Sequence, residues 1–75
     1  MSEKLPRIIS GEIIRVLLKL GFSLTRQSGS HKIYKNSEGK RVTVPFHAGE
    51  VLRPKTLKSI LSDAGITVEE LRKLL

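Results

Sequence analysis

The middle of the chain, from residue 22 to residue 46, has the pattern of three short strands separated by two glycine-containing turns. Val42, Val44 and Phe46 alternate with polar neighbours and fall on one side of the last strand, where Pro45 marks its end or an edge. Turns this short join neighbouring strands as antiparallel hairpins. The predicted strands are Phe22–Gln27, His31–Asn36 and Arg41–Phe46. The sequence therefore predicts a three-stranded meander with one apolar face.

Two amphipathic helices flank this meander and can cover its apolar face. Ser10 is the predicted N-cap of a helix over Gly11–Leu20, and Gly21 ends that helix. Pro54 suits the first turn of a second helix, which Gly65 ends. Both helices carry apolar residues at helical spacing: Ile13, Ile14, Val16, Leu17, Leu18 and Leu20 in the first, and Leu57, Ile60, Leu61 and Ala64 in the second. We predict that both stripes are core.

A third, short helix is predicted near the C-terminus. Thr67 and Glu70 have the spacing of a capping box. The apolar residues of this helix are Val68, Leu71, Leu74 and Leu75. They either complete the core or dock a partner, and we favour core because a small domain needs the buried area. Residues 1–75 are thus predicted to form a single α+β domain of order α-β-β-β-α(-α), with helices packed on one face of an antiparallel sheet, as in double-stranded-RNA-binding domains.

The charge balance favours a polyanionic partner. Lys and Arg number 14 against 7 Asp and Glu, which gives a net charge of +7. Such an excess attracts nucleic acid or a strongly acidic protein. The chain has no cysteine, which excludes disulfides and thiolate metal sites. It has no apolar run near the roughly 18 residues of a membrane span and no signal peptide features, so we expect a cytoplasmic protein that does not enter membranes.

His31 is the residue on which a catalytic function would depend. It is one of two histidines and follows the turn Ser28-Gly29-Ser30, where the first predicted strand leads into the second. If Ile33 points inward, strict alternation places His31 on the core side at the end of the sheet. If a bulge at Gly29-Ser30 shifts the phase, His31 is fully exposed. The alternative to catalysis is an ordinary surface histidine near a turn.

Several segments in this order resemble the HicA-type toxins (YcfA-like family) of toxin–antitoxin pairs. The similarity covers about residues 10–72. It rests on Leu20-Gly21-Phe22, Gly29-Ser30-His31 with Ile33-Tyr34, Val44-Pro45-Phe46-His47 with Gly49, Thr56-Leu57 with Ile60-Leu61, and Ala64-Gly65-Ile66.

The resemblance implies a double-stranded-RNA-binding-like fold, endoribonuclease activity on messenger RNA, and neutralisation by a HicB-type antitoxin. It also places the family's catalytic histidine on His31. Lys55 departs from the pattern, because the family often has glycine there; a lysine can change the loop leading from His47 or add a contact to phosphate.

A histidine suits RNA cleavage because RNA carries its own nucleophile, the 2′-hydroxyl. The imidazole titrates near neutral pH, so it can take the proton of that hydroxyl or protonate the leaving 5′-oxygen. Neither step needs a metal ion or a cofactor, and we expect neither. Nearby polar and basic side chains can hold the phosphate. The candidate RNA-binding residues are Arg26, Ser30, Lys32, Lys35, Lys40, Arg41 and His47.

Several candidate residues also have structural alternatives. His47 either shares the acid–base work with His31 or is a loop histidine bonded to backbone. Ser30 is interpreted as a turn residue that can donate to phosphate; it is not expected to be a nucleophile, since no carboxylate lies nearby in the sequence to complete a triad. Tyr34 is predicted to pack in the sheet rather than to stack on a base. No metal site is expected, because the acidic residues are scattered.

Two other functions fit the same composition. A non-catalytic RNA-binding module would bind RNA in a salt-dependent manner without cutting it. A basic face that only docks an acidic protein would show no RNA affinity even at low salt. Of the three, the ribonuclease toxin is our prediction, as a monomer alone and in a larger complex with its antitoxin.

Overall fold

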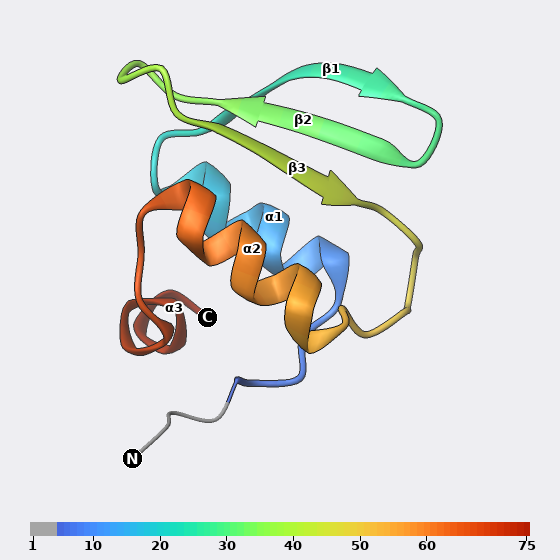
Figure 1. Cartoon of the computed structure of the whole chain (residues 1–75), viewed down its shortest axis with the longest axis vertical. Coiled ribbons are helices and arrows are strands. Elements are labelled where there is room, and N and C mark those ends of the chain that lie inside the picture. Colours follow the sequence, from blue (N-terminus) through green and yellow to red (C-terminus); the bar gives the residue numbers. More distant parts are fainter. Residues whose placement is uncertain (1–4) are drawn as a thin grey trace.

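Three helices and a three-stranded sheet make up the computed structural model, which describes residues 5–75. The first four residues of the predicted N-terminal lead-in lie outside the described residues. In chain order the elements are α1 (Ser10–Lys19), β1 (Ser23–Ser28), β2 (His31–Lys35), β3 (Arg41–Pro45), α2 (Pro54–Ala64) and α3 (Val68–Leu74). The sheet is antiparallel with order β1-β2-β3, and α1 and α2 lie side by side against one of its faces (Figure 1). The predicted α+β fold is confirmed.

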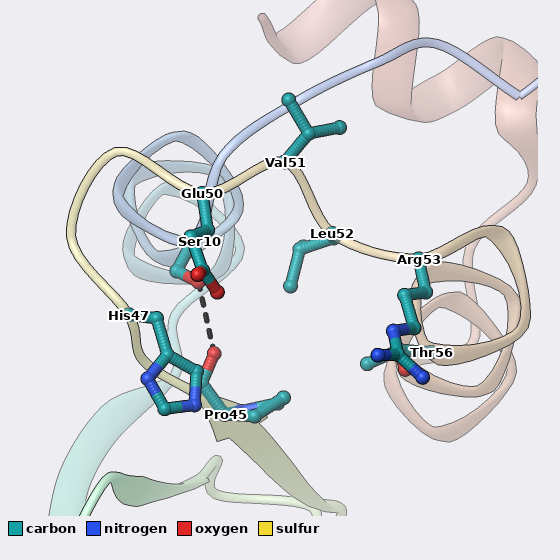
Figure 2. Close-up of a pocket in the computed structure, with 8 residues that line it drawn as sticks. All are labelled: Ser10, Pro45, His47, Glu50, Val51, Leu52, Arg53 and Thr56. Carbon is teal, nitrogen blue, oxygen red and sulfur yellow. Dashed lines mark hydrogen bonds between the residues drawn. The ribbon is translucent and has the colours of Figure 1, made fainter.

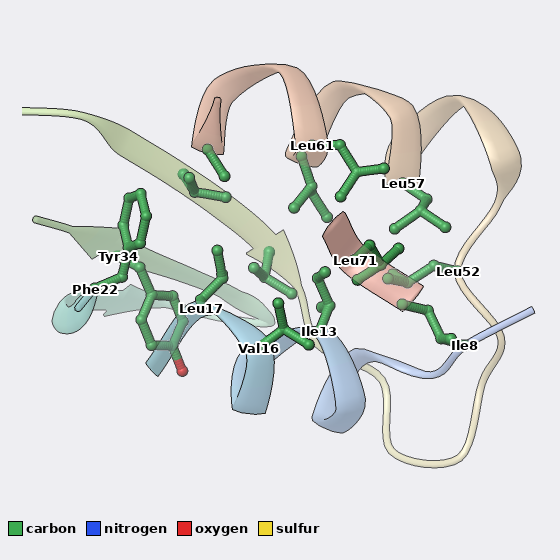
Figure 3. Packing of buried hydrophobic residues seen from close by; sticks show 14 residues of the cluster. Ile8, Ile13, Val16, Leu17, Phe22, Tyr34, Leu52, Leu57, Leu61 and Leu71 are labelled. Carbon is green, nitrogen blue, oxygen red and sulfur yellow. The ribbon is translucent and has the colours of Figure 1, made fainter. Parts of the chain in front are cut away.

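The hydrophobic core lies between the sheet and the helices (Figure 3). All three helices contribute to it, as do β2 and β3. Ile8 and Leu52 join from outside the regular elements, where the Leu52 N–H donates to the Ile8 carbonyl at 2.8 Å. The buried apolar residues are Ile8, Ile13, Val16, Leu17, Phe22, Tyr34, Val42, Val44, Leu52, Leu57, Ile60, Leu61, Ala64 and Leu71.

Tyr34 identifies the face of the sheet that meets the helices. It pairs with Val42, and Lys32 pairs with Val44. Directly opposite residues share a face, and Val42, Val44 and Tyr34 are all buried. The prediction that Tyr34 packs is therefore confirmed. Pro45 is the last residue of β3, which is an edge strand, as its proline predicted.

Three apolar residues that were predicted to face the core are exposed instead: Leu18, Leu24 and Leu75. Leu24 was placed on the apolar side of a half-buried strand, yet it is 48% exposed and all of β1 is exposed. Leu18 was placed in the helical stripe and is 53% exposed. The helices contact β3 and leave β1 at the uncovered edge of the sheet, so its alternation has no partner surface to meet.

The prediction that Ser10 caps α1 is wrong. Ile9 occupies the N-cap position, and its N–H donates a hydrogen bond to the Glu12 carboxylate at 2.9 Å. Ser10 is the first helical residue, and its hydroxyl donates to the carbonyl of Pro45 at 2.9 Å. The hydroxyl is used to join the start of α1 to the end of β3, because an edge-strand carbonyl needs a hydrogen-bond donor.

The two signals for the C-terminal helices are confirmed. Gly65 ends α2 with a left-handed φ of 75°. Thr67 and Glu70 form the capping box, with reciprocal bonds of 3.1 and 3.0 Å between side chains and backbone N–H groups. Leu71 is completely buried, whereas Leu75 is 49% exposed. The third helix therefore belongs to the core through Leu71. None of the described helices is long and apolar enough to cross a bilayer.

The buried position of Tyr34 makes the stability of the fold depend on pH in the alkaline range. Desolvation raises the pKa of the Tyr34 phenol above its ordinary value of 10.0. A pKa that is raised by folding contributes stability below the unfolded pKa and loses it as the pH rises through the folded value. We expect the free energy of unfolding, measured by urea denaturation, to fall above about pH 10. The fall should be shallower in Tyr34→Phe, and equal slopes in both proteins would refute this cause.

Candidate functional site

His31 is the first residue of β2, at the end of the sheet where β3 finishes. It pairs with Ser28 of β1 and with Pro45 of β3. Side chains alternate along a strand, so His31 faces away from the side occupied by Tyr34 and the helices. We call this second side the open face. The His31 side chain is exposed there.

The structure decides between the two placements that the sequence left open. Ile33 lies on the open face with His31 and does not point into the core, because the buried phase of β2 belongs to Tyr34. The irregularity in the hairpin lies between Leu24 and Arg26 of β1 and not at the turn before His31. His31 is exposed, as the second placement required, but for a different reason.

Three cationic side chains lie on the open face with His31. Arg26 pairs with Ile33, and Lys35 pairs with Arg41. All three cations are exposed. Residues on one face of a strand recur about every 6.6 Å, so Arg26 is one step from His31 along the sheet and the other two cations are two steps away. A hollow of about 300 Å³ between them is lined by Thr25, Arg26, Ile33, Lys35 and Arg41.

Ser30 and Lys32 flank His31 but make structural contacts. The carbonyl of Ser30 accepts a hydrogen bond from the Phe46 N–H at 2.6 Å, which extends the pairing beyond the end of β3. Lys32 is on the helix side of the sheet, with its Nζ 4.1 Å from the centroid of the Phe46 ring. Both contacts fix the end of the hairpin on which His31 stands.

Lys40 lies away from His31. It precedes β3 at the opposite end of the β2–β3 hairpin, where its Nζ is 3.9 Å from a carboxylate oxygen of Glu38. A Cβ added to Gly65 would come within 2.6 Å of the same Nζ, so Lys40 sits by the end of α2. The structure does not bring this predicted RNA-binding residue to the site.

His47 lies in the loop that follows β3 and lines a cleft of about 320 Å³ (Figure 2). Pro45, the partner of His31 in the sheet, also lines it, so the cleft begins next to the His31 end of the hairpin. We call it the loop cleft. Its lining residues are Ser10, Pro45, His47, Glu50, Val51, Leu52, Arg53 and Thr56.

Sequence reasoning missed Glu50, Arg53 and Thr56 as members of a site. They lie in an irregular loop and in the first turn of α2, where no periodicity indicates which side chains converge. Their polarity within a few residues of His47 was the available signal. Lys55, the departure from the family pattern, is exposed in the same first turn.

The arrangement around His31 suits proton transfer near a polyanion. An exposed imidazole stands at the end of a face that carries three cations, and such a face attracts a phosphate backbone. Among residues 5–75, no group of three or more His, Asp or Glu side chains is placed to hold a metal ion.

The sequence was compared with curated proteins and with models of protein families. A search of curated proteins gave no match. A family model described as the HicA toxin of bacterial toxin–antitoxin systems matches residues 10–66. The matched range contains α1, the whole sheet, His31, the loop cleft and α2, and it stops before α3. A toxin of such a system has an antitoxin as its partner. This chain therefore belongs to the HicA toxin family of bacterial toxin–antitoxin systems.

Proposed function

We propose that this toxin is an endoribonuclease that cuts messenger RNA, with His31 as a general acid or base. The observation behind the proposal is the exposed His31 at the end of a sheet face that carries Arg26, Lys35 and Arg41. Membership of a toxin family supports it, since cutting messenger RNA stops growth. A cytoplasmic substrate places the activity in the cytoplasm.

In the proposed reaction the 2′-oxygen of one nucleotide attacks the adjoining phosphorus atom. The 2′-hydroxyl loses its proton to a base, the bond between phosphorus and the 5′-oxygen breaks, and that oxygen receives a proton from an acid. The products are a 2′,3′-cyclic phosphate and a 5′-hydroxyl. His31 supplies one of the two proton transfers, each of which contributes about 10²- to 10⁴-fold to a rate.

The cations of the open face would act on the phosphate. Negative charge builds up on the phosphate oxygens in the transition state, and a fixed cation stabilises it. Arg26 is placed best for this, one step from His31 on the same face. Lys35 and Arg41 would hold neighbouring phosphates of the strand, which orients the RNA across His31.

The direct test is incubation of the purified toxin with end-labelled RNA in EDTA. We expect cleavage that leaves cyclic-phosphate and 5′-hydroxyl ends and that needs no metal ion. RNA binding without cleavage would replace this proposal by the non-catalytic RNA-binding module. Absence of binding at low salt would favour a basic face that only docks an acidic protein.

Neutralising the open face should weaken RNA binding and reduce its salt dependence. The slope of log affinity against log salt is negative, and each phosphate contact on a single strand contributes about −0.7 to it. In a variant with Arg26→Gln, Lys35→Gln and Arg41→Gln, we therefore expect the slope to become less negative by about 2. A charge-matched control carries Arg15→Gln, Lys58→Gln and Lys73→Gln, which are exposed positions on the helices. Fluorescence anisotropy over a salt series measures both, and equal slopes would refute RNA binding by this face.

We further propose that the antitoxin is of the HicB type and that the toxin alone is a monomer. Acidic groups on the antitoxin would complement the net charge of +7 and block the face that RNA uses. Size-exclusion chromatography with light scattering is expected to give a single-chain mass for the toxin. It should give a larger complex once the antitoxin is added.

A further inference from the structure

The loop cleft contains three side chains to which the proposed reaction assigns no role. His47, Glu50 and Arg53 all line it (Figure 2). Within residues 5–75, none of these three side chains makes a hydrogen bond or ion pair. A cation and a carboxylate thus line one cleft without neutralising each other. Both remain available to a ligand.

The walls of the loop cleft are fixed by bonds between distant segments. The Ser10 hydroxyl donates to the Pro45 carbonyl at 2.9 Å, as the dashed line in Figure 2 marks. Val51 forms an antiparallel bridge with Ile9. The Leu52 N–H bonds the carbonyl of Ile8, and the Leu52 side chain is anchored in the core. The loop that carries the three free side chains is therefore held at both ends, so the cleft is formed before any ligand arrives.

The chemistry of the lining specifies a ligand with two kinds of group. The Arg53 guanidinium offers planar paired donors that match a phosphate. The Glu50 carboxylate only accepts hydrogen bonds, so it suits an amino group. A nucleotide with an exocyclic amino group on its base carries both. At about 320 Å³ the cleft is within the range of small-ligand sites.

The loop cleft adjoins the end of the sheet at which His31 lies. Pro45 lines the cleft and is the direct sheet partner of His31. Paired Cα atoms in an antiparallel sheet lie about 4.5–5.5 Å apart. An RNA strand that passes over the end of β3, with its reacting phosphate at His31 on the open face, can therefore reach the cleft with the adjoining nucleotide.

We propose that the loop cleft binds the nucleotide next to the scissile phosphate and selects its base. Arg53 contacts a phosphate of that nucleotide, and Glu50 accepts a hydrogen bond from the exocyclic amino group of cytosine, adenine or guanine. Uracil has only carbonyl oxygens as exocyclic groups, so it offers the Glu50 carboxylate no exocyclic N–H donor and is bound less well than the other bases. The inference rests on the proposed ribonuclease function.

The base selection is tested on a pool of single-stranded RNA oligonucleotides of random sequence. Sequencing the 5′-hydroxyl ends made by the wild type should show depletion of uracil at one position beside the cut. Glu50→Gln, which has nearly the same shape and can also donate, should lose that depletion. Asp63→Asn removes the same charge from an exposed site on α2 and should retain it. An unchanged profile in Glu50→Gln would overturn the selection.

The phosphate contact is tested by steady-state kinetics on the same RNA pool. Arg53→Gln should raise KM roughly tenfold, since charge-assisted hydrogen bonds are stronger than neutral ones. The value of kcat should stay within about threefold, because this cleft does not contain His31. Lys58→Gln on the exposed side of α2 is the matched control and should behave as wild type. A KM equal to that of wild type in Arg53→Gln would overturn the contact.

A binding experiment separates failure of this inference from failure of the proposed function. Cytidine and uridine 3′-monophosphates are titrated into His31→Ala while amide NMR signals are followed. Larger shifts at residues 47–56 with the cytidine nucleotide support the cleft even if no RNA is cut. Equal responses to both nucleotides, or no response there, overturn the base selection. If the wild type cuts RNA but the cleft binds both nucleotides equally, the proposed ribonuclease function holds and the proposed base selection is wrong.

Discussion

Replacing His31 with alanine is expected to lower the rate of RNA cleavage by about 10²- to 10⁴-fold. The imidazole is the proposed proton carrier, and among the described residues that the sheet places on the open face His31 is the only histidine. The residue is exposed, so its removal should change the free energy of unfolding by no more than about 0.5 kcal/mol. Cleavage of a labelled RNA in EDTA gives the rate, and circular dichroism checks the fold.

The matched control for this variant is Ser28→Ala. Ser28 pairs with His31 in the same row of the sheet and is also exposed, so it reports any local disturbance of the hairpin. It should cut RNA at nearly the rate of the wild type. If His31→Ala also cuts at that rate, the proposed role of His31 is wrong. If neither the wild type nor the variant cuts but both bind RNA, Lys55→Gly is the next protein to assay.

Replacing Leu71 with alanine is expected to cost about 2–5 kcal/mol of stability. Leu71 is completely buried in the core, although it lies beyond the residues that match the family model. Small domains have only about 5–15 kcal/mol in total. A large fraction of the stability therefore depends on α3, and the variant should melt at a markedly lower temperature.

Leu75→Ala is the control for the contribution of α3. Leu75 is 49% exposed at the end of the chain, so truncating it should change stability by about 0.5 kcal/mol or less. Urea denaturation followed by circular dichroism compares the two variants with the wild type. Equal midpoints for Leu71→Ala and Leu75→Ala would contradict the contribution of Leu71 to the stability of the core.

The elements could be predicted from the sequence where the signal is local. Pro54 and Gly65 set the bounds of α2 by their own backbone preferences, and Thr67 with Glu70 begins α3 by capping. Val42 and Val44 indicated the buried face of β3 through a period of two. These signals need only a few neighbouring residues, so the order of helices and strands followed directly from them.

The errors occurred where a residue depends on a distant partner. The same kind of alternation misplaced Leu24, since an edge strand that the helices do not cover has no core to face. Ser10 has the chemistry of an N-cap, but it is the first residue inside α1, and its hydroxyl donates to the carbonyl of Pro45, 35 residues away. Ile8 carried no periodic signal and is buried by its bond to Leu52.

By itself the sequence determined the order of the elements, the basic charge and the position of His31 at the mouth of a hairpin. The tertiary structure decided the side of the sheet on which His31 stands, because burial of Tyr34 against the helices fixes the phase of β2. It also decided that Arg26 lies near His31, that Lys40 lies at the opposite end of the β2–β3 hairpin, and that Glu50 and Arg53 line one cleft. Strand pairing and loop closure bring residues together across long sequence separations, and local patterns do not specify those distances.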